Sequence, residues 1–365
     1  MIYRKNFDII NLMIFNPFKA IRKNFLGVDI GISLIKIVEI SKRGGKIDLK
    51  NYGQVAVYSL YQRPYQGFKG ERESFMLSSP DISKVIKAIL KETRIKTREA
   101  TFTIPDFSTF FTTFNLPPMS EEEIPEAVNF EARRHIPVPV SDVVLDWFLI
   151  GGQTGRRGTE LKILLVAVPQ EIIARYQEIA TASELELKYL EAEAFSLARA
   201  LARDIKETVC LLDIGAQSTT INIVDGGILK LSYSSDISGN DFTQAIARSL
   251  SVNFQKAETI KKEKGVESEE IKEVLLPFVN LIIIEMEKIF KDFETREKII
   301  QKIIIAGGSS SLSGLNQYIS SYFKKETIMA NPFFGLNYPP LLEKKLKETG
   351  PSFAIAVGAA LRGFI

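Results

Sequence analysis

The residues best suited to chemistry lie in two similar acidic turns, one in each half of the chain. Residues 26–33 read LGVDIGIS and residues 211–218 read LLDIGAQS, so each apolar strand ends in Asp-x-Gly and a polar turn. A second apolar segment follows at 34–40 and at 219–224, which predicts two β-hairpins with glycine at the tight bend. A carboxylate beside backbone N–H groups freed by glycine can hold hydrated magnesium and phosphate oxygens. The duplication predicts two related half-domains facing each other across a nucleotide.

Within each turn the residue types suit particular parts of a bound phosphate. Asp29 and Lys36 lie on the outgoing and returning strands of the first hairpin, so both side chains can face its mouth. The carboxylate would order metal-bound water and the ammonium would neutralise phosphate, although a turn-forming aspartate and a solvated lysine would read the same way. In the second hairpin Asp213 is the matching anchor, and residues 215–220 supply backbone donors and hydroxyl groups. Serine and threonine are also common in ordinary β-turns.

A third glycine turn lies far downstream. Gly307 and Gly308 follow the apolar segment 302–306, and the residues from Ser309 onward predict a helix. The positive end of a helix beside two glycines can receive an anion or the edge of a ring. A single turn of this kind is a weak signal, and the combination of all three turns in this order is the stronger one.

The composition limits what the chain can do. It has 365 residues, 45% of them hydrophobic and 25% charged, and its net charge of +3 is too small to indicate a nucleic-acid partner. The one cysteine, Cys210, lies in an apolar run, so we expect a buried strand residue and no disulfide framework. The longest apolar stretch, 278–284, falls well short of the roughly 18 residues that a spanning helix requires. This length favours two domains or two large lobes.

The first 24 residues differ from the rest of the chain. They mix Ile, Leu and Phe with Arg and Lys and lack the small-residue cleavage site of a secretory signal. They would either lie on an anionic membrane surface as an interfacial helix or form a loosely ordered leader, with Met13 as an alternative start.

A separate unit interrupts the first half of the chain. Between residues 106 and 168 the pattern predicts a strand, a helix and two more strands. Ser120 and Glu123 form a capping box at the predicted start of that helix, and Pro137 ends it near Ile136.

Taken together, the two acidic hairpins and the late Gly-Gly turn resemble the motifs of the actin-like ATPases, a superfamily that includes actin, the DnaK-type chaperones, sugar kinases and the cell-division protein FtsA. The resemblance implies an α/β fold of two lobes with duplicated sheets and helices, ATP and Mg²⁺ as cofactors, and an insert placed as in FtsA. It implies two phosphate motifs (Asp29, Gly31, Ser33 and Lys36; Asp213, Gly215, Gln217, Ser218 and Thr219), an adenosine site (Glu258, Lys261, Gly307, Gly308 and Ser309) and Mg²⁺ held through water by Asp29 and Asp213.

Two acidic residues compete for the place of the superfamily's water-orienting acid. The resemblance favours Glu191, acting with Gln217, and Glu193 is the nearby rival. A solvated helix start would also favour glutamate there. Glu258 and Lys261 could equally be a surface salt pair, because residues three apart on a helix face each other.

Within the superfamily the insert resembles the PilM family of type IV pilus assembly proteins. The similarity is clearest in EAVNFEARRHIPVP at 126–139 and LDWF at 145–148, and it extends over nearly everything from Phe25 on. We expect a leader at 1–23, subdomain IA from 24–105, 169–208 and 345–365, the inserted subdomain IC at 106–168, subdomain IIA from 209–240 and 296–344, and subdomain IIB at 241–295.

The resemblance to PilM implies a cytoplasmic adaptor, peripheral to the bacterial inner membrane, that binds the N-terminal cytoplasmic tail of PilN. It also implies contacts with other pilus inner-membrane and motor proteins, a capacity for homo-oligomers, and membrane contact that is indirect or made through the leader. An extended tail in a groove between the first lobe and the insert would gain main-chain hydrogen bonds and side-chain pockets. The candidate groove residues, each with core packing as its alternative, are Phe130, Ile136, Val138, Leu145 and Trp147. His135, the only histidine, is expected to be structural.

Two other functions remain open on the sequence. In place of the later glycines of the second phosphate motif the chain has Ala216 and Gln217, so we expect at most a slow Mg²⁺-dependent ATPase in which ATP is mainly a structural ligand. A sugar-kinase-type phosphotransferase would need an acidic base, for which Asp106 is the candidate. A filament-forming, membrane-associated protein of the FtsA type would normally end in an amphipathic helix, whereas this sequence ends in RGFI.

Overall fold

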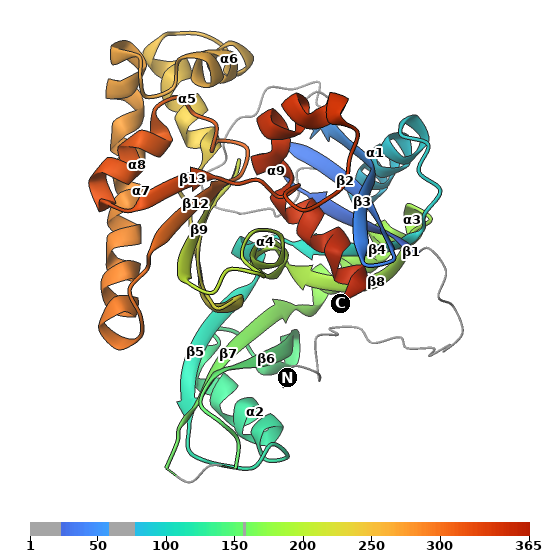
Figure 1. Ribbon diagram of the computed structural model, residues 1–365, viewed down its shortest axis with the longest axis vertical. Helices are drawn as coiled ribbons and strands as arrows, with labels where there is room; N and C mark the ends of the chain where they lie inside the picture. Colours follow the sequence, from blue (N-terminus) through green and yellow to red (C-terminus); the bar gives the residue numbers. More distant parts are fainter. Residues whose placement is uncertain (1–22, 58–76, 156–157) are drawn as a thin grey trace.

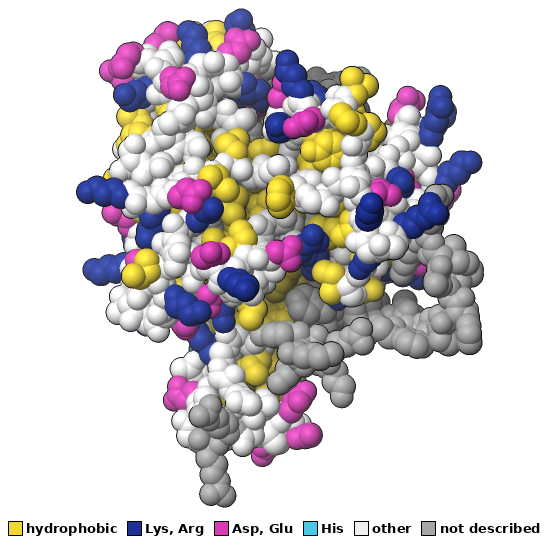
Figure 2. All heavy atoms as spheres, viewed as in Figure 1, with side chains coloured by type: hydrophobic (Ala, Val, Ile, Leu, Met, Phe, Trp, Pro, Cys, Tyr) yellow, Lys and Arg dark blue, Asp and Glu magenta, His cyan; other side chains and the backbone are white. Residues whose placement is uncertain are grey.

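Two large lobes stand side by side above a smaller three-stranded sheet in the computed structural model, which describes residues 23–57, 77–155 and 158–365 (Figure 1). The lobe at the right of the view contains α1, α3 and α9, and the lobe at the left contains α5 to α8. On the face shown in Figure 2, acidic and basic side chains are intermixed over both lobes. The predicted leader at 1–23 lies outside the described residues except for Lys23, which begins β1.

The first lobe is built on a five-stranded sheet. A three-stranded antiparallel meander is extended by two strands parallel to β1, in the spatial order β3-β2-β1-β4-β8. Helices α1 and α3 pack on apolar side chains of one face, and α9 packs on the other. The elements are β1 (Lys23–Ile30), β2 (Leu34–Arg43), β3 (Lys46–Ala56), α1 (Ser79–Glu92), β4 (Glu99–Ile104), α3 (Gln170–Ala182), β8 (Glu186–Ala192) and α9 (Glu343–Leu361).

The second lobe repeats this arrangement. Its strands lie in the order β11-β10-β9-β12-β13, so the third, second, first, fourth and fifth strands follow one another in space in both lobes. One face is covered by α4 and the other by α5 to α8. The elements are α4 (Glu193–Leu201), β9 (Thr208–Ile214), β10 (Thr219–Asp225), β11 (Ile228–Ser235), α5 (Gly239–Ser249), α6 (Phe254–Lys264), α7 (Glu269–Arg296), β12 (Lys302–Ala306), α8 (Leu315–Phe323) and β13 (Glu326–Met329).

The insert forms the small sheet at the bottom of Figure 1. A short 3₁₀ turn, η2 (Asp106–Ser108), leads from β4 into it. Its strands lie in the order β5-β7-β6, and α2 packs on one face through Ile124, Val128 and Ala132. The predicted strand, helix, strand, strand order is confirmed by β5 (Phe110–Leu116), α2 (Ile124–His135), β6 (Val143–Gly151) and β7 (Leu161–Pro169).

Two predicted helix starts are wrong. The helix of the insert begins at Ile124 rather than Ser120, because Pro125 suits the first turn of a helix and the expected capping pair closes a separate turn, in which the Ser120 N–H donates to Glu123 Oε2 at 2.7 Å. The helix expected from Ser309 begins only at Leu315, after Gly314 with φ of 80°. Gly307 and Gly308 therefore precede a run of turns and not the first residue of a helix.

Two smaller predictions concern burial and membrane insertion. Cys210 is fully buried in β9, as expected, and burial raises the pKa of its thiol. No helix within the described part of the chain is both long and apolar enough to cross a membrane.

Candidate functional site

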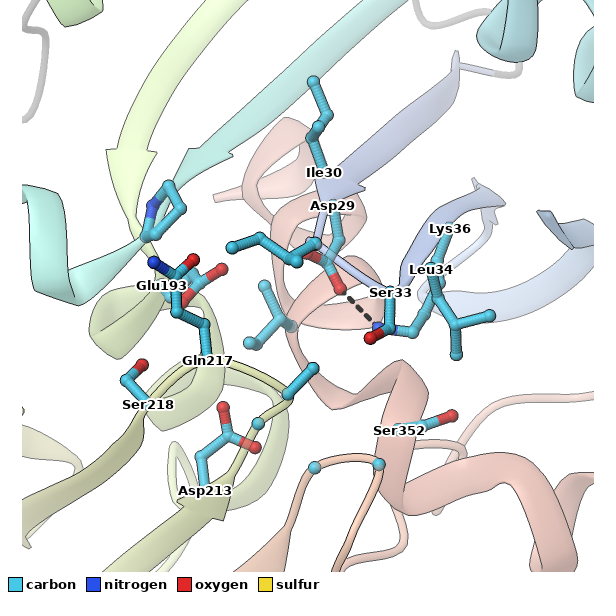
Figure 3. A pocket seen from close by; sticks show the side chains of 18 of the residues that line it. Asp29, Ile30, Ser33, Leu34, Lys36, Glu193, Asp213, Gln217, Ser218 and Ser352 are labelled. Carbon is cyan, nitrogen blue, oxygen red and sulfur yellow. Dashed lines mark hydrogen bonds and ion pairs between the residues drawn. The ribbon is translucent and has the colours of Figure 1, made fainter. Parts of the chain in front are cut away.

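A cavity opens between the two lobes, and both acidic hairpins contribute to its wall (Figure 3). Asp29 and Lys36 lie on one side of it, and Asp213, Gln217 and Ser218 lie on the other. The remaining wall comes from the segment after β4, the start of α4, the Gly-Gly turn and α9. These parts contribute Pro105, Phe107, Glu193, Gly307, Gly308, Pro351, Ser352 and Ile355.

The two hairpin turns have the same backbone geometry. The N–H of Gly31 donates to the carbonyl of Leu34 at 3.0 Å, and the N–H of Gly215 donates to the carbonyl of Ser218 at 2.9 Å. In each turn a Cβ on the glycine would press against the carbonyl that the glycine N–H binds, so only a residue without a Cβ fits this tight turn without strain. The sequence repeat is therefore a repeat of structure, and it places two equivalent turns on opposite walls of the cavity.

In the first hairpin the predicted acid and base are already paired. Asp29 and Lys36 are direct cross-strand partners, and Lys36 Nζ lies 2.8 Å from Asp29 Oδ2. Burial lowers the pKa of Lys36, but the charge and hydrogen bond of Asp29 outweigh it, so the pKa is raised overall. The ammonium thus stays charged at the cavity wall, where it can neutralise an incoming phosphate only while sharing its charge with Asp29.

The Gly-Gly turn closes directly on the second acidic anchor. Gly307 has φ of 92°, and a Cβ there would collide with the Asp213 carboxylate and the Ile214 carbonyl. Its N–H donates to the carbonyl of Pro351 in α9 at 3.0 Å. A Cβ on Gly308, by contrast, would meet nothing within 4 Å, so this residue leaves the cavity wall open. A glycine at 307 is therefore required for the turn itself to pack against Asp213.

The charge balance of the cavity favours a cation. Burial, offset in part by Lys36 and increased by Asp29, raises the pKa of Asp213 to about 6. Burial also raises the pKa of Glu193 well above its usual value, and the charges of Asp29, Asp106 and Asp213 raise it further. Three acidic side chains, those of Asp29, Glu193 and Asp213, thus line the cavity together with one lysine, Lys36. A divalent cation would relieve this repulsion, so the residues present fit a magnesium nucleotide.

The described residues also indicate how such a cation would be held. They include no group of three His, Cys, Asp or Glu side chains close enough to bind a metal ion together. Magnesium usually keeps several waters and takes other ligands from substrate phosphates, so water-mediated contacts with Asp29 and Asp213 fit its chemistry. Gln217 Oε1, on the cavity wall, is buried and has no hydrogen-bond partner in the described part of the protein, which leaves an acceptor for a bound water.

Glu191, the predicted water-orienting acid, does not reach the cavity. Its carboxylate forms a buried, two-pronged pair with Arg199 at 2.5 and 2.7 Å and accepts from Ser196 Oγ at 2.5 Å. Arg199 also donates to the carbonyl of Gly358 at 2.9 Å, so the group ties α4 to α9. Glu191 and Glu193 are two residues apart and point to different places, and it is the rival, Glu193, that lines the cavity.

In the predicted adenosine pair the lysine is buried and the glutamate is partly buried. Lys261 is 4% exposed, and its Nζ lies 2.7 Å from Glu258 Oε2, 2.8 Å from Thr243 Oγ1 and 3.0 Å from the carbonyl of Gly239. This excludes a solvated surface salt pair. Gly239 in turn donates its N–H to the carbonyl of Gly215 at 2.8 Å, so the pair lies behind the second hairpin. Glu258 and Lys261 do not themselves line the cavity between the hairpins.

The other predicted residues either line the cavity or are buried behind it. Gly31, Ser33, Gly215, Gln217 and Ser218 line the cavity as expected. Thr219 and Ser309 are buried behind it instead. Sequence reasoning missed the parts of the wall formed by Phe107 and Ser352. A signal for the second existed, because Ser352 lies in the stretch from Phe25 onward over which the sequence resembles the PilM family.

The candidate groove residues lie on the insert in three kinds of environment. Phe130 on α2 is 59% exposed and Val138 is 46% exposed. Leu145 and Trp147 on β6 are half-buried against the core of the insert, and Ile136 is buried in that core. The alternative of core packing therefore describes Ile136, whereas Phe130 and Val138 are available to a partner.

One prediction follows from the buried acids. Burial, opposed by the N–H of Ala194 and assisted by Asp213, raises the pKa of Asp106 to about 7. The folded state then holds a proton that the unfolded state releases near pH 4, so stability present at low pH is lost as pH rises through 7. In EDTA we expect Asp106 alone to lower the free energy of unfolding by about 2–3 kcal/mol between pH 5 and 8, measured by urea denaturation. Asp213 and Glu193, whose pKa values are also raised, add to the total fall. Asp106→Asn should therefore reduce the total fall by about 2–3 kcal/mol, and an unchanged fall would contradict the prediction.

The chain is similar to known proteins over most of its length. A model of the family described as type IV pilus assembly protein PilM matches residues 27–364. A solved PilM-PilN type IV pilus biogenesis complex is similar with a TM-score of 0.78 and 27% identity, covering 93% of this chain and 98% of the other. The ethanolamine utilization protein EutJ from Carboxydothermus hydrogenoformans has a TM-score of 0.57 and 17% identity, covering 95% and 91%. MreB 5 of Spiroplasma citri bound to AMPPNP has a TM-score of 0.50 and 14% identity, covering 90% and 98%. The predicted two-lobed actin-like fold is confirmed.

Proposed function

Because this chain belongs to the family of type IV pilus assembly protein PilM, we propose that it is an ATP-binding adaptor that holds the N-terminal cytoplasmic tail of PilN. The observation that carries the proposal is the family match over residues 27–364, joined by the similarity to a PilM-PilN complex. In this role the chain is cytoplasmic and peripheral to the inner membrane, and it links the tail to other inner-membrane and motor proteins of the pilus. Self-association is part of the same proposal.

The cavity between the lobes is the nucleotide site of this adaptor. Backbone turns at Gly31 and Gly215 face each other across it, and Lys36 supplies positive charge. Asp29 and Asp213 would hold Mg²⁺ through water. ATP with Mg²⁺ is the ligand that this set of groups suits, since it brings phosphate oxygens for the turns and a cation for the acids. The Gly-Gly turn and the Glu258–Lys261 pair behind the second hairpin are the proposed adenosine side.

Nucleotide turnover is proposed to be slow. Glu193 takes the place at the cavity wall that the resemblance assigned to Glu191, so the water-orienting acid of the superfamily is not at its expected position. Ala216 and Gln217 add side chains at the turn where the superfamily has glycines. ATP would then act chiefly by stabilising one arrangement of the lobes.

The insert, proposed as subdomain IC, offers a place for an extended peptide. Strand β6 lies at the edge of its sheet, and the N–H of Trp147 donates at 2.8 Å to the side chain of its neighbour Asp146. An edge with backbone groups outside the ladder can accept an added strand. Exposed Phe130 and Val138 add apolar surface nearby on the same unit. Main-chain pairing with β6 and apolar side-chain contacts together would suit the PilN tail.

The proposal is tested by titrating the full chain with a synthetic peptide of the PilN tail from the same genome, with and without Mg²⁺ and AMPPNP. Saturable binding of one peptide per chain supports the adaptor. Absence of binding in both conditions contradicts it.

A single substitution tests the docking surface. We expect Phe130→Ala to weaken peptide binding at least tenfold, because an exposed aromatic side chain that becomes buried is a typical binding hot spot. Phe334→Ala is the matched control, since Phe334 is 84% exposed and lies in the connection after β13, away from the insert. Both variants should unfold at the wild-type temperature. Equal affinity of the two variants would place the tail elsewhere.

The kinase alternative loses its candidate base. Asp106 is 3% exposed, accepts a hydrogen bond from the backbone of α4 and does not line the cavity. A phosphotransferase would need that carboxylate to reach a substrate hydroxyl. The filament alternative is tested by pelleting the chain with ATP.

A further inference from the structure

Asp106 supplies a helix cap from a distant part of the chain. Its Oδ1 accepts a hydrogen bond from the N–H of Ala194 at 3.0 Å, and the two residues are 88 positions apart. Ala194 is the second residue of α4, and the N-cap residue of that helix, Ala192, has no side chain that could accept. Free N–H groups at a helix start are normally satisfied by an N-cap side chain. Asp106 performs that function for α4 from another element.

The cap fixes a residue of the nucleotide cavity. Glu193 is the first residue of α4, and it projects into the cavity opposite Asp29 (Figure 3). Pro105 and Phe107, on either side of Asp106, line the same cavity. The short segment around Asp106 is therefore both a part of the cavity wall and the support of the helix that carries Glu193.

The same segment begins the insert. Residues 106–108 form η2, and β5 follows at Phe110. The insert touches α4 a second time through Phe195, whose ring centroid lies 4.8 Å from that of Phe148 on β6 and 6.1 Å from that of Phe111 on β5. A rotation of the insert relative to the first lobe must therefore move the start of α4 or break the hydrogen bond to Asp106.

The insert is also held by the second lobe. Lys162 on β7 pairs with Glu297, which directly follows α7, and Lys230 on β11 donates to the carbonyl of Ile150 on β6. If the lobes move around a nucleotide, these contacts with the second lobe transmit the movement to the insert. Asp106 connects the insert to the nucleotide cavity by a separate contact.

We propose that Asp106 is a positioning residue that holds the Glu193 end of α4 in the nucleotide cavity and couples that cavity to a peptide bound on the insert. The inference deepens the proposed function and rests on it. What it adds is a defined contact through which peptide and nucleotide affect each other's affinity. Because the contact is a hydrogen bond to a side-chain oxygen, an asparagine can replace the aspartate, whereas an alanine cannot.

The test measures coupling rather than activity. The dissociation constant of the synthetic PilN-tail peptide is determined by calorimetry with and without Mg²⁺ and AMPPNP, for the wild type, Asp106→Asn, Asp106→Ala and the exposed control Asp142→Ala. We expect the nucleotide to change peptide affinity at least fivefold in the wild type, the asparagine variant and the control. In Asp106→Ala the nucleotide should change peptide affinity less than twofold. The peptide affinity of this variant without nucleotide should differ from that of the wild type by less than threefold.

A second variant, Ala194→Pro, keeps the inference testable if Asp106→Ala does not fold. Ala194→Pro removes the capped N–H itself, and proline already occupies the second helical position in α1 and α2, as Pro80 and Pro125. It should lose coupling as Asp106→Ala does. Coupling that persists in a folded Asp106→Ala or Ala194→Pro variant overturns the inference, as does equal loss in the asparagine and alanine variants. Peptide binding without any nucleotide effect in the wild type overturns the inference alone, whereas no binding at all overturns the proposed function.

Discussion

Asp213→Asn is expected to weaken the binding of Mg²⁺-ATP about 10- to 100-fold, while the binding of ATP in EDTA stays equal or improves. The two directions have one cause. Asp213 faces the cavity from the end of β9, and in the proposed site its carboxylate orders the water shell of Mg²⁺. Loss of such an outer-shell partner typically costs this much metal affinity. Without the metal the same carboxylate repels phosphate, so its neutralisation removes a penalty.

The measurement is a pair of calorimetric titrations with ATP, one in excess MgCl₂ and one in EDTA. Asp292→Asn is the matched control, because Asp292 is an exposed acid on α7 that pairs with Arg296 at 2.8 Å. It changes the net charge equally and should change neither affinity. If Asp213→Asn lost affinity by the same factor in both buffers, Asp213 would act on the nucleotide or the fold and not on the metal.

Local sequence patterns were sufficient for the parts of the fold that depend on neighbouring residues. The two hairpins could be predicted because alternation, glycine and turn residues act within a few positions, and the turns at Gly31 and Gly215 prove to have the same hydrogen bond. Helix starts were harder. At Ser120 the capping pair closes a turn of its own, and the helix begins one turn later at Ile124, with Pro125 in its first turn.

The choice between neighbouring acids could not be made from the sequence. Glu191 is the last but one residue of β8 and Glu193 begins α4, and either could have faced the cavity. Arg199 decides between them, because it lies on the next turns of α4 and binds the Glu191 carboxylate with both of its terminal nitrogens. A buried carboxylate of this kind needs a charged partner, and that partner was identifiable only once the helix was placed.

The pairing of Asp106 with Ala194 is a still more distant relation. The sequence marked Asp106 only as an acid after a proline, which suggested a catalytic base. Its role as a cap depends on two segments meeting at the junction of the first lobe, the insert and α4. Such contacts follow from the tertiary fold, and no local pattern encodes them.

Gly358→Ala is expected to destabilise the chain by about 2–4 kcal/mol, even though alanine is the better helix former by about 1 kcal/mol. Gly358 lies in α9 where this helix crosses α4, and a Cβ at this position would collide with the backbone of Ser196. Backbone atoms cannot turn aside as a flexible side chain can, so the helices must separate, and overpacking of a core typically costs 1–3 kcal/mol or more. Separation would also stretch the hydrogen bond from Arg199 to the Gly358 carbonyl.

Gly350→Ala in the same helix is the matched control. A Cβ at Gly350 would meet Pro332 and Phe333 at 3.5–3.8 Å, which is ordinary van der Waals contact. The gain in helix propensity is offset there by the following Pro351, which disfavours helical geometry at the residue before it, so we expect a change below about 1 kcal/mol. Urea denaturation compares the two variants directly. If Gly358→Ala were as stable as Gly350→Ala, α4 and α9 could separate at this crossing without cost, and the close packing of the two helices would not contribute to stability.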